Sequence, residues 1–314
     1  MKLTLHVGLP KTATTYVQHT LSDAKRTLLD KGVIYPGSSV QHHDIPANLE
    51  LAILGLKPYG RRADALLAAF ETEVRESGAE HLLISTEYLI ETSAEALALL
   101  HKKLRARFPA LREVVALCYV REPIAFATSF CQQVVKSAHQ RLEDFYRNPW
   151  PLNLRDCLAR LGGEFGRDAI RVRNFHPDAL KDGDVLADFV DALGIQDWSI
   201  TPPERLLNQA LSSEGLQIAD ALAVLRPVED RRRQFRRLYR RQLEAIPGKK
   251  FVLPSDVQTR VIERSRQDLA MLKAEFGIEL VPKRQPVDKV YAMPAETAEA
   301  LARLVIEAVE RPPR

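Results

Sequence analysis

Short apolar runs alternate with amphipathic segments through roughly the first 200 residues of the chain. The short apolar runs predict strands, and apolar residues at helical spacing predict helices. Strands are expected at residues 3–7, 32–37, 81–85, 113–120 and 169–175. Helices are expected at residues 14–29, 63–75, 123–137 and 184–194, and one more begins at a capping box of Thr92 and Glu95.

The predicted strands are apolar along their length instead of alternating between apolar and polar residues. This pattern is typical of parallel strands that helices cover on both faces. After about residue 205 the strand signals fade, and helices are expected at residues 231–243, 254–277 and 294–309. We therefore predict one α/β domain over residues 1–314, with a central parallel sheet flanked by helices at about 1–200 and a mainly helical extension at 205–314.

The composition indicates a folded protein and limits the classes of partner that it is expected to bind. Hydrophobic residues make up 46% of the chain, and the formal charge is only +4, from 45 basic and 41 acidic residues. This balance gives no argument for binding nucleic acid, so anion binding must come from local clusters.

The spacing of Cys118, Cys131 and Cys157 matches neither a zinc site nor a redox pair, and we expect buried thiols in a reducing compartment. Without a signal peptide or a membrane-spanning run, the sequence predicts a soluble cytoplasmic protein.

The sequence GLPKTATT, residues 8–15, joins the first predicted strand to the first predicted helix. Such a loop presents unpaired backbone N–H groups and the positive end of the helix dipole, which bind anions. Lys11 adds a positive charge, and Gly8 allows a tight turn. The plainer interpretation is a strand-to-helix turn with a surface lysine and a threonine cap, but the cluster of threonines favours anion binding. The predicted binding residues are Gly8, Pro10, Lys11, Thr12, Ala13, Thr14 and Thr15.

The spacing of this loop differs from that of a nucleoside-triphosphate loop. A Walker A loop has a glycine, four further residues and then Gly-Lys followed by serine or threonine. Here Lys11 follows Gly8 by three positions, and no glycine precedes the lysine. The strand at 113–120 is followed by Arg121 instead of an aspartate that could hold magnesium. The loop therefore fits an anion that arrives without a metal ion.

Arg121 is a second candidate for anion binding. It follows a buried strand, and α/β sheets bind ligands at the carboxyl ends of their strands. Ser129 lies eight residues further on, roughly 10 Å along the predicted helix, which lets both side chains hold one phosphate. The plainer interpretation of Arg121 is an ion-pair residue.

Two segments resemble the sulfotransferases that use 3′-phosphoadenosine 5′-phosphosulfate (PAPS). GLPKTATTYVQ resembles their 5′-phosphosulfate loop, and VREPIAFATSF resembles their 3′-phosphate element. Weaker likenesses, such as LLISTEYL, extend the resemblance over most of the chain. The resemblance implies a P-loop-NTPase-like three-layer sandwich and a metal-free transfer that releases 3′,5′-ADP. It also implies that Lys11 lies by the bridging oxygen and that Arg121 and Ser129 hold the 3′-phosphate.

The chain departs from the family pattern in two places. The family often has a glycine where this chain has Ala13, and alanine resists positive φ. We therefore expect a loop that differs slightly or that does not need this freedom. The family's Arg-Lys-Gly loop on the nucleotide side is matched poorly by Gly248-Lys249-Lys250, so the adenine contacts stay open.

The acceptor of the sulfuryl group needs a base near the loop. Glu87 follows the strand at 81–85 and so belongs to the same sheet edge, and the resemblance places a glutamate or histidine base in this region. Its plainer role is to prepare the next helix or to pair with a lysine. His43, or its neighbour His42, is the second candidate because histidine titrates near neutral pH, although such a pair is commonly solvated. His6 is predicted to be structural.

An arginine-rich helix is expected in the C-terminal part. It holds seven arginines, the first being Arg231 and the last Arg241. The plainer interpretation is a solvated helix face. The functional interpretation is a peripheral docking surface for an acidic glycan or an anionic membrane.

The sequence thus favours a PAPS-dependent sulfotransferase that acts on a hydroxyl or an amine. A glycan, a lipid-linked saccharide, a small alcohol and a peptide are all open as acceptors, because a fold does not fix the substrate. One alternative is a P-loop nucleotide kinase or NTPase, which predicts a Walker A loop and a magnesium requirement. The other is a non-catalytic module that binds anions or glycans, against which the intact Lys11 argues.

Overall fold

The computed structural model describes residues 1–150, 152–198, 210–225, 239–287 and 293–310. The chain divides into two compact units. Unit 1 comprises residues 1–121, 153–205 and 270–279, and unit 2 comprises residues 122–152, 206–269 and 280–314. Residues 122–152 thus group with C-terminal helices and not with the sheet, a division that the hydrophobic pattern does not predict.

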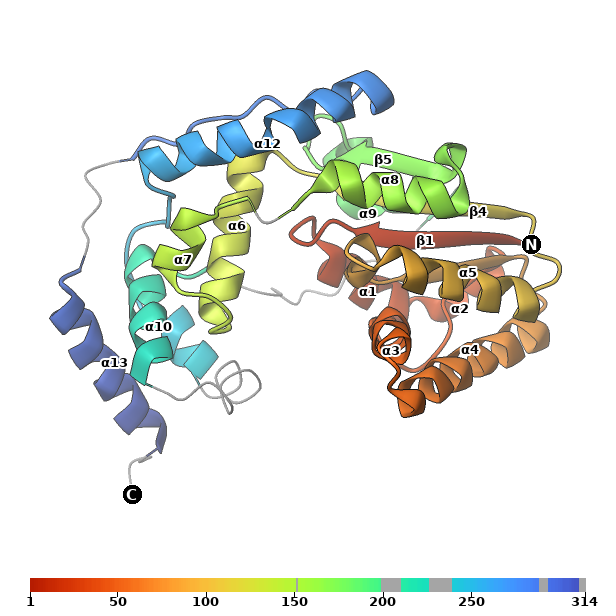
Figure 1. Cartoon of the computed structure of the whole chain (residues 1–314), viewed down its shortest axis with the longest axis horizontal. Coiled ribbons are helices and arrows are strands. Elements are labelled where there is room, and N and C mark those ends of the chain that lie inside the picture. Colours follow the sequence, from red (N-terminus) through yellow and green to blue (C-terminus); the bar gives the residue numbers. More distant parts are fainter. Residues whose placement is uncertain (151, 199–209, 226–238, 288–292, 311–314) are drawn as a thin grey trace. The chain divides into compact units, whose positions relative to one another are not determined.

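Unit 1 is built on a parallel sheet (Figure 1). Among the described residues the sheet has five strands, in the order β2-β3-β1-β4-β5, and every pair of neighbours is parallel. This confirms the predicted α/β class and its parallel sheet. The strands are β1 (Lys2–Gly8), β2 (Val33–Ile34), β3 (His81–Ser85), β4 (Glu113–Val120) and β5 (Ile170–Asn174).

The strand order defines the edge at which a ligand is expected. Strand β1 lies between β3 and β4, so the order of strands reverses on either side of it. The carboxyl ends of these three strands meet at one edge because all of them run in the same direction. In α/β sheets, ligands bind at such a switch point, outside the carboxyl ends.

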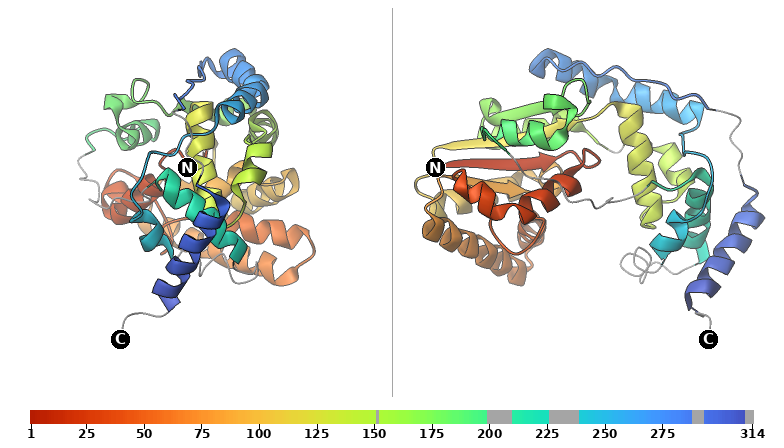
Figure 2. Two further views of the ribbon diagram at one scale, coloured as in Figure 1. Left: turned by 90° about the vertical axis from the view of Figure 1, so that its left-hand side faces the viewer. Right: turned by 180° about the vertical axis from the view of Figure 1, so that it is seen from behind.

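Helices cover both faces of the sheet, as the views from the front and from behind agree (Figures 1 and 2). One face carries α1 (Thr14–Asp23), α2 (Lys25–Asp30) and α9 (Val185–Ala192), and the other carries α5 (Ala94–Arg107) and α8 (Leu154–Phe165). The remaining elements of unit 1 are α3 (Asp44–Ile53), α4 (Lys57–Ser77) and the short turns η1 (Glu87–Ile90), η2 (Arg167–Ala169) and η3 (Lys181–Gly183).

Apolar side chains of the strands pack with the helices in the core of unit 1. Val17 and Leu21 of α1 pack with Leu83 of β3 and with Phe189 of α9. Leu5 of β1 is fully buried as well. Full burial of each such side chain contributes about 1.5–3 kcal/mol. This packing fixes the strand ends that carry the candidate site.

Several element boundaries differ from the prediction. The helix expected at 14–29 is interrupted at Ala24, which divides it into α1 and α2. Helix α3 forms in a segment for which the hydrophobic pattern predicts neither a helix nor a strand. The side chain that caps α5 is Ser93, which accepts a hydrogen bond from the Ala96 amide, and not Thr92. Thr92 instead donates to the Tyr88 carbonyl at 2.8 Å.

Unit 2 is helical in its described residues, which confirms the predicted helical C-terminal region. Its helices are α6 (Pro123–Lys136), α7 (Leu142–Arg147), α10 (Ser213–Leu225), α13 (Ala295–Glu310) and most of α12 (Ser255–Phe276). Polar contacts tie them together: Arg141 pairs with Asp220 at 2.7 Å, and the Trp150 indole donates to Asp268 at 2.9 Å. Residues 231–238 of the predicted arginine-rich helix lie outside the described residues.

The prediction for the cysteines is confirmed, because all three side chains are buried and none forms a disulfide. Within the described residues, no helix has both the length and the apolar character needed to cross a membrane.

Candidate active site

The turn from β1 into α1 requires a glycine at position 8. Gly8 adopts φ 105°, a conformation that other residues rarely adopt. A Cβ added there would lie 3.2 Å from the Pro10 nitrogen and 3.3 Å from the Glu87 Cβ. The Leu9 amide donates a 2.9 Å hydrogen bond to the Tyr119 carbonyl of β4. The turn is therefore fixed between the ends of β3 and β4.

Two residues of this loop that are not glycine adopt left-handed backbone conformations. Lys11 has φ 68°, and Ala13 has φ 59° with ψ 22°. The expectation that Ala13 would avoid positive φ is wrong, since this alanine adopts the conformation that favours glycine. A left-handed residue with a Cβ costs on the order of 1–2 kcal/mol and persists only where its surroundings hold it, commonly at ligand-binding loops.

The N-terminus of α1 carries no side-chain cap. Ala13 occupies the N-cap position and makes no side-chain hydrogen bond. In the part of the chain that the structure describes, the amides of Thr12, Thr14 and Thr15 have no acceptor in the protein. Unpaired amides at the positive end of a helix bind anions. The loop thus leaves backbone amides unpaired, as expected for a turn from a strand into a helix, and their binding of an anion stays a prediction.

The threonine hydroxyls are less available than the sequence suggests. Thr12 is 1% exposed, and its hydroxyl donates to the Leu9 carbonyl at 2.7 Å. The Thr14 hydroxyl donates to Oε2 of Glu87, also at 2.7 Å. Only Thr15, among these described hydroxyls, has no hydrogen bond to the protein. An anion in the loop would therefore be held mainly by amides, by Lys11 and by Thr15.

Arg121 reaches the same loop from the end of β4. Its Nη1 donates a 2.8 Å hydrogen bond to the carbonyl of Lys11, a residue 110 positions away. The guanidinium carbon lies 5.6 Å from the centre of the Phe175 ring, which supports it from β5's end. The structure therefore brings Arg121 to the loop at one edge of the sheet.

Ser129 lies half-buried on α6 in unit 2, whereas Arg121 is the last residue of the first segment of unit 1. Their pairing around one phosphate stays a prediction. The N-terminus of α6 already has a cap, because the Glu122 carboxylate accepts from the amides of Ile124 at 2.9 Å and Ala125 at 2.7 Å. An anion cannot bind these amides while Glu122 occupies them, in contrast to α1.

Glu87 lies beside the loop at the end of β3. It opens the turn η1, and its Cβ faces the Gly8 backbone. Oε2 accepts the hydrogen bond from Thr14, and Oε1 has no hydrogen bond among the described residues. The carboxylate is thus held by the loop through one oxygen and keeps the other available.

His43 reaches the same place from the start of α3. Its Nδ1 lies 2.5 Å from Oγ1 of Thr86, and its ring stacks on Tyr88 with centres 4.3 Å apart and planes 11° apart. Burial lowers the pKa of His43, and the nearby carboxylates of Glu87 and Asp44 partly oppose this effect. The structure therefore places both candidate bases, from distant parts of the sequence, next to each other.

The other two histidines of this region are structural. His42 is 3% exposed, its Nδ1 accepts from the Ser85 amide at 3.1 Å, and burial lowers its pKa to about 4. His6 is 2% exposed, its Nδ1 lies 2.8 Å from the Ser85 hydroxyl, and burial lowers its pKa to about 3. The choice between His42 and His43 therefore falls on His43.

Thr86 and Tyr88 are parts of the site that the sequence analysis does not single out. Thr86 is fully buried and touches His43, and Tyr88 is 52% exposed although it is aromatic. The one sequence signal that could have identified them is their position. Both residues directly follow β3 at the carboxyl edge of the sheet, where functional side chains of parallel sheets gather.

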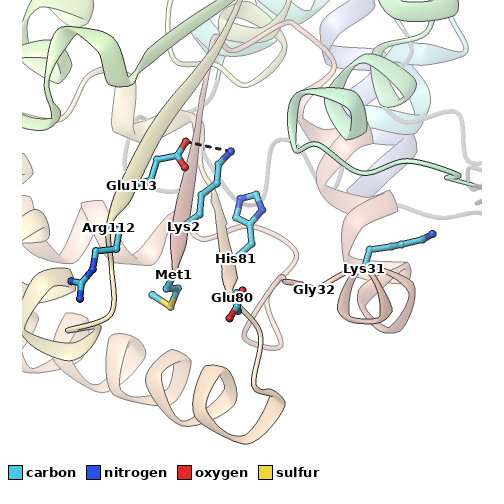
Figure 3. Close-up of a pocket in the computed structure, with 8 residues that line it drawn as sticks. All are labelled: Met1, Lys2, Lys31, Gly32, Glu80, His81, Arg112 and Glu113. Carbon is cyan, nitrogen blue, oxygen red and sulfur yellow. Dashed lines mark ion pairs between the residues drawn. The ribbon is translucent and has the colours of Figure 1, made fainter.

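A pocket of about 470 Å³ opens at the opposite edge of the sheet (Figure 3). It lies by the amino ends of β1, β3 and β4, and an ion pair of 3.5 Å joins Lys2 to Glu113 in its wall. None of the predicted site residues lines it. The lining residues are Met1, Lys2, Lys31, Gly32, Glu80, His81, Arg112 and Glu113.

The described residues contain no group of three or more histidine, cysteine, aspartate or glutamate side chains placed to hold a metal ion. Comparison of the chain with protein-family models, with curated proteins and with solved structures found no match. The structure itself establishes an α/β protein with a five-stranded parallel sheet in its described residues.

Proposed function

We propose that this protein is a PAPS-dependent sulfotransferase, which moves the sulfuryl group of PAPS to a hydroxyl or an amine and releases 3′,5′-ADP. One observation carries the proposal. The loop with Lys11, which leads into the uncapped N-terminus of α1, meets Arg121 of the β4 end at the carboxyl edge of the sheet, where α/β proteins bind their ligands. PAPS carries two separate anionic groups, one at the 5′ and one at the 3′ position. Two neighbouring anion-binding elements suit such a ligand.

The residues present fit the donor. The unpaired amides at the start of α1, with Lys11 and Thr15, suit the 5′-phosphosulfate. Arg121, at the end of β4, is assigned to the 3′-phosphate. A guanidinium has five donors, so Arg121 can keep its bond to the Lys11 carbonyl while it binds a phosphate.

The transfer needs one bond to form and one to break. The acceptor oxygen or nitrogen bonds to sulfur while the bond from sulfur to the bridging oxygen breaks, and its electron pair leaves with the 5′-phosphate. Lys11 stabilises the charge that develops on the departing oxygen. The proton of the acceptor passes to a base, for which Glu87 and His43 are the candidates. Catalysis rests on position and charge stabilisation, as in phosphoryl transfer.

A glycan is the acceptor class that the site suits best. Tyr88 is 52% exposed and lies against His43, beside Glu87 in the chain. A flat aromatic surface with a polar tip can pack against the apolar face of a sugar ring. Lipid-linked saccharides share this sugar ring, whereas a small alcohol or a peptide would make less use of Tyr88.

Thermal melting with different ligands tests the proposal. We expect 3′,5′-ADP to raise the melting temperature, because a ligand at 100 times its Kd adds about 2.7 kcal/mol of stability. The Lys11→Met variant should lose most of this gain, and the Lys31→Met variant, at the opposite edge of the sheet, should keep it. Stabilisation by ATP with magnesium but not by 3′,5′-ADP would favour a kinase or NTPase and overturn the proposal. Stabilisation by 3′,5′-ADP without turnover of PAPS on any acceptor would favour the non-catalytic module.

A further inference from the structure

Thr86 lies within hydrogen-bond distance of His43, one of the two candidate bases. We propose that Thr86 is a positioning residue. It holds His43 in the form that donates a hydrogen bond to the substrate that receives the sulfuryl group, so that Glu87 takes the proton of this substrate. This inference rests on the proposed function, but its first test does not depend on turnover.

The Thr86 hydroxyl has one proton to donate and two lone pairs to accept with. Its oxygen accepts from the Tyr88 amide at 3.3 Å and lies 2.5 Å from Nδ1 of His43. Thr86 is fully buried, and within the described residues its hydroxyl makes no other hydrogen bond. If Nδ1 carried a proton, the hydroxyl proton would be left without an acceptor in a buried site.

Leaving a buried donor unpaired costs about 1–3 kcal/mol. The favoured arrangement therefore has the Thr86 hydroxyl donating to a bare Nδ1 of His43. A neutral imidazole carries a single proton, which must then sit on Nε2. Burial favours this neutral form, because it lowers the pKa of His43.

His43 in this form presents an N–H and not a lone pair to a ligand. Its Nε2 makes no hydrogen bond among the described residues, and the stacking on Tyr88 fixes the plane of the ring. Oε1 of Glu87 is likewise without a partner in the part that the structure describes, while Thr14 holds Oε2. One hydrogen-bond donor, Nε2–H of His43, and one hydrogen-bond acceptor, Oε1 of Glu87, thus lie beside the anion loop.

A hydroxyl group of the substrate can hydrogen-bond to both His43 and Glu87. Its oxygen accepts from Nε2–H of His43, and its own proton is donated to Oε1 of Glu87. When the oxygen bonds to sulfur, the proton moves fully to the Glu87 carboxylate and the electron pair of the broken S–O bond leaves with the phosphate. His43 keeps its proton throughout and orients the acceptor.

Nitrogen-15 NMR of histidine-labelled protein reads the tautomer directly, without PAPS or an acceptor. We expect His43 above its pKa to show a protonated Nε2 and a bare Nδ1. His42 serves as an internal reference, since its Nδ1 accepts from the Ser85 amide and must be bare. Thr86→Ser should keep the His43 signature, and Thr86→Val should shift it toward a mixture of tautomers. A protonated Nδ1 in the wild-type protein, or no change in Thr86→Val, overturns the proposal.

Substitutions of His43 and Glu87 give the second test. The amide nitrogen of glutamine can occupy the place of Nε2 and donate a hydrogen bond, but it cannot accept a proton. We expect His43→Gln to keep kcat/KM within about 5-fold of wild type, and both His43→Ala and Glu87→Gln to lower it by about 10²-fold or more. If His43→Gln is as inactive as His43→Ala while Glu87→Gln stays active, His43 is the base and the proposal is wrong. Absence of any transfer by the wild type counts against the proposed function, whereas the NMR result decides the tautomer alone.

Discussion

The guanidinium of Arg121, at the end of β4, donates a 2.8 Å hydrogen bond to the backbone carbonyl of Lys11 in the loop that follows β1. The bond goes to the backbone, so Arg121 holds the left-handed conformation of Lys11 (φ 68°) in place. Arg121 therefore supports the loop, and under the proposed function it is also a ligand of the 3′-phosphate.

Removal of Arg121 should weaken binding of the nucleotide and loosen the loop. Hydrogen bonds to charged groups contribute about 1.5–3 kcal/mol, so we expect Arg121→Ala to raise the Kd for 3′,5′-ADP at least 10-fold in calorimetry. Hydrogen exchange of the amides around Lys11 should become faster even without ligand. Arg171→Ala is the matched control, because Arg171 on β5 is exposed and its guanidinium donates to the backbone carbonyls of Asp168 and Ile170. Equal effects of the two substitutions would contradict this role of Arg121.

A glycine at position 13 should stabilise the protein. Ala13 has a left-handed backbone, and a glycine avoids the steric cost of a Cβ there, although its greater freedom in the unfolded chain offsets part of the gain. We expect Ala13→Gly to raise the free energy of unfolding by about 0.5 kcal/mol in urea denaturation. Ala24→Gly, at φ −100°, should instead lower it by about 0.5–1 kcal/mol. The idea fails if both substitutions destabilise the protein alike.

The buried histidines should make stability fall in mild acid. The pKa of His42 is lowered from 6.5 to about 4, and that of His6 to about 3, in both cases by burial. Below pH 6.5 the unfolded chain binds protons that the folded protein excludes, so stability decreases as the pH falls from about 6.5 to 4. Each histidine contributes a slope of about 1.4 kcal/mol per pH unit within this window. Urea denaturation at several pH values measures the slope, and His42→Gln should reduce it by about that amount; an unchanged slope would refute the prediction.

Asp188 should be among the residues most important for the stability of unit 1. It is 3% exposed, accepts from the Tyr119 hydroxyl at 2.6 Å and pairs with Arg173 at 2.8 Å. Loss of one partner from a buried pair costs about 3–5 kcal/mol, and because Arg173 is one-third exposed we expect about 2–3 kcal/mol for Asp188→Asn. Asp178→Asn, at a 91% exposed side chain, should change the free energy of unfolding by less than about 0.5 kcal/mol. A small effect of Asp188→Asn would show that the buried network does not stabilise the fold.

The sheet was predictable because its signals are local. The clearest signals are the short apolar runs of β3 and β4, and both strands match the predicted ranges residue for residue. The pattern does not predict α3, because two histidines precede the helix and its first residues are Asp-Ile-Pro, which are typical of a loop. Packing of Ile45 and Leu49 into the core, each at most 2% exposed, stabilises a helix that local preferences do not favour.

The candidate site was predictable where it depends on strand ends and less so where it depends on packing. Lys11, Arg121 and Glu87 each follow a strand, and parallel topology brings strand ends together. Thr86 and Tyr88 join the candidate site only through their contacts with His43, which belongs to another segment of the chain. The left-handed conformation of Ala13 could not be inferred either, because alanine in isolation disfavours it and the surrounding loop imposes it.

Transfer of sulfur-35 from labelled PAPS to an acceptor would show whether this protein is a sulfotransferase. The purified protein would be incubated, without added metal, with glycans, lipid-linked saccharides and small alcohols, and labelled product and 3′,5′-ADP would be measured together. We predict that at least one acceptor gains label in step with release of 3′,5′-ADP, that Lys11→Met lowers the rate by about 10²-fold or more, and that Lys31→Met does not. Turnover of ATP with magnesium and no use of PAPS, or undiminished transfer by Lys11→Met, would contradict a PAPS-dependent sulfotransferase that relies on Lys11.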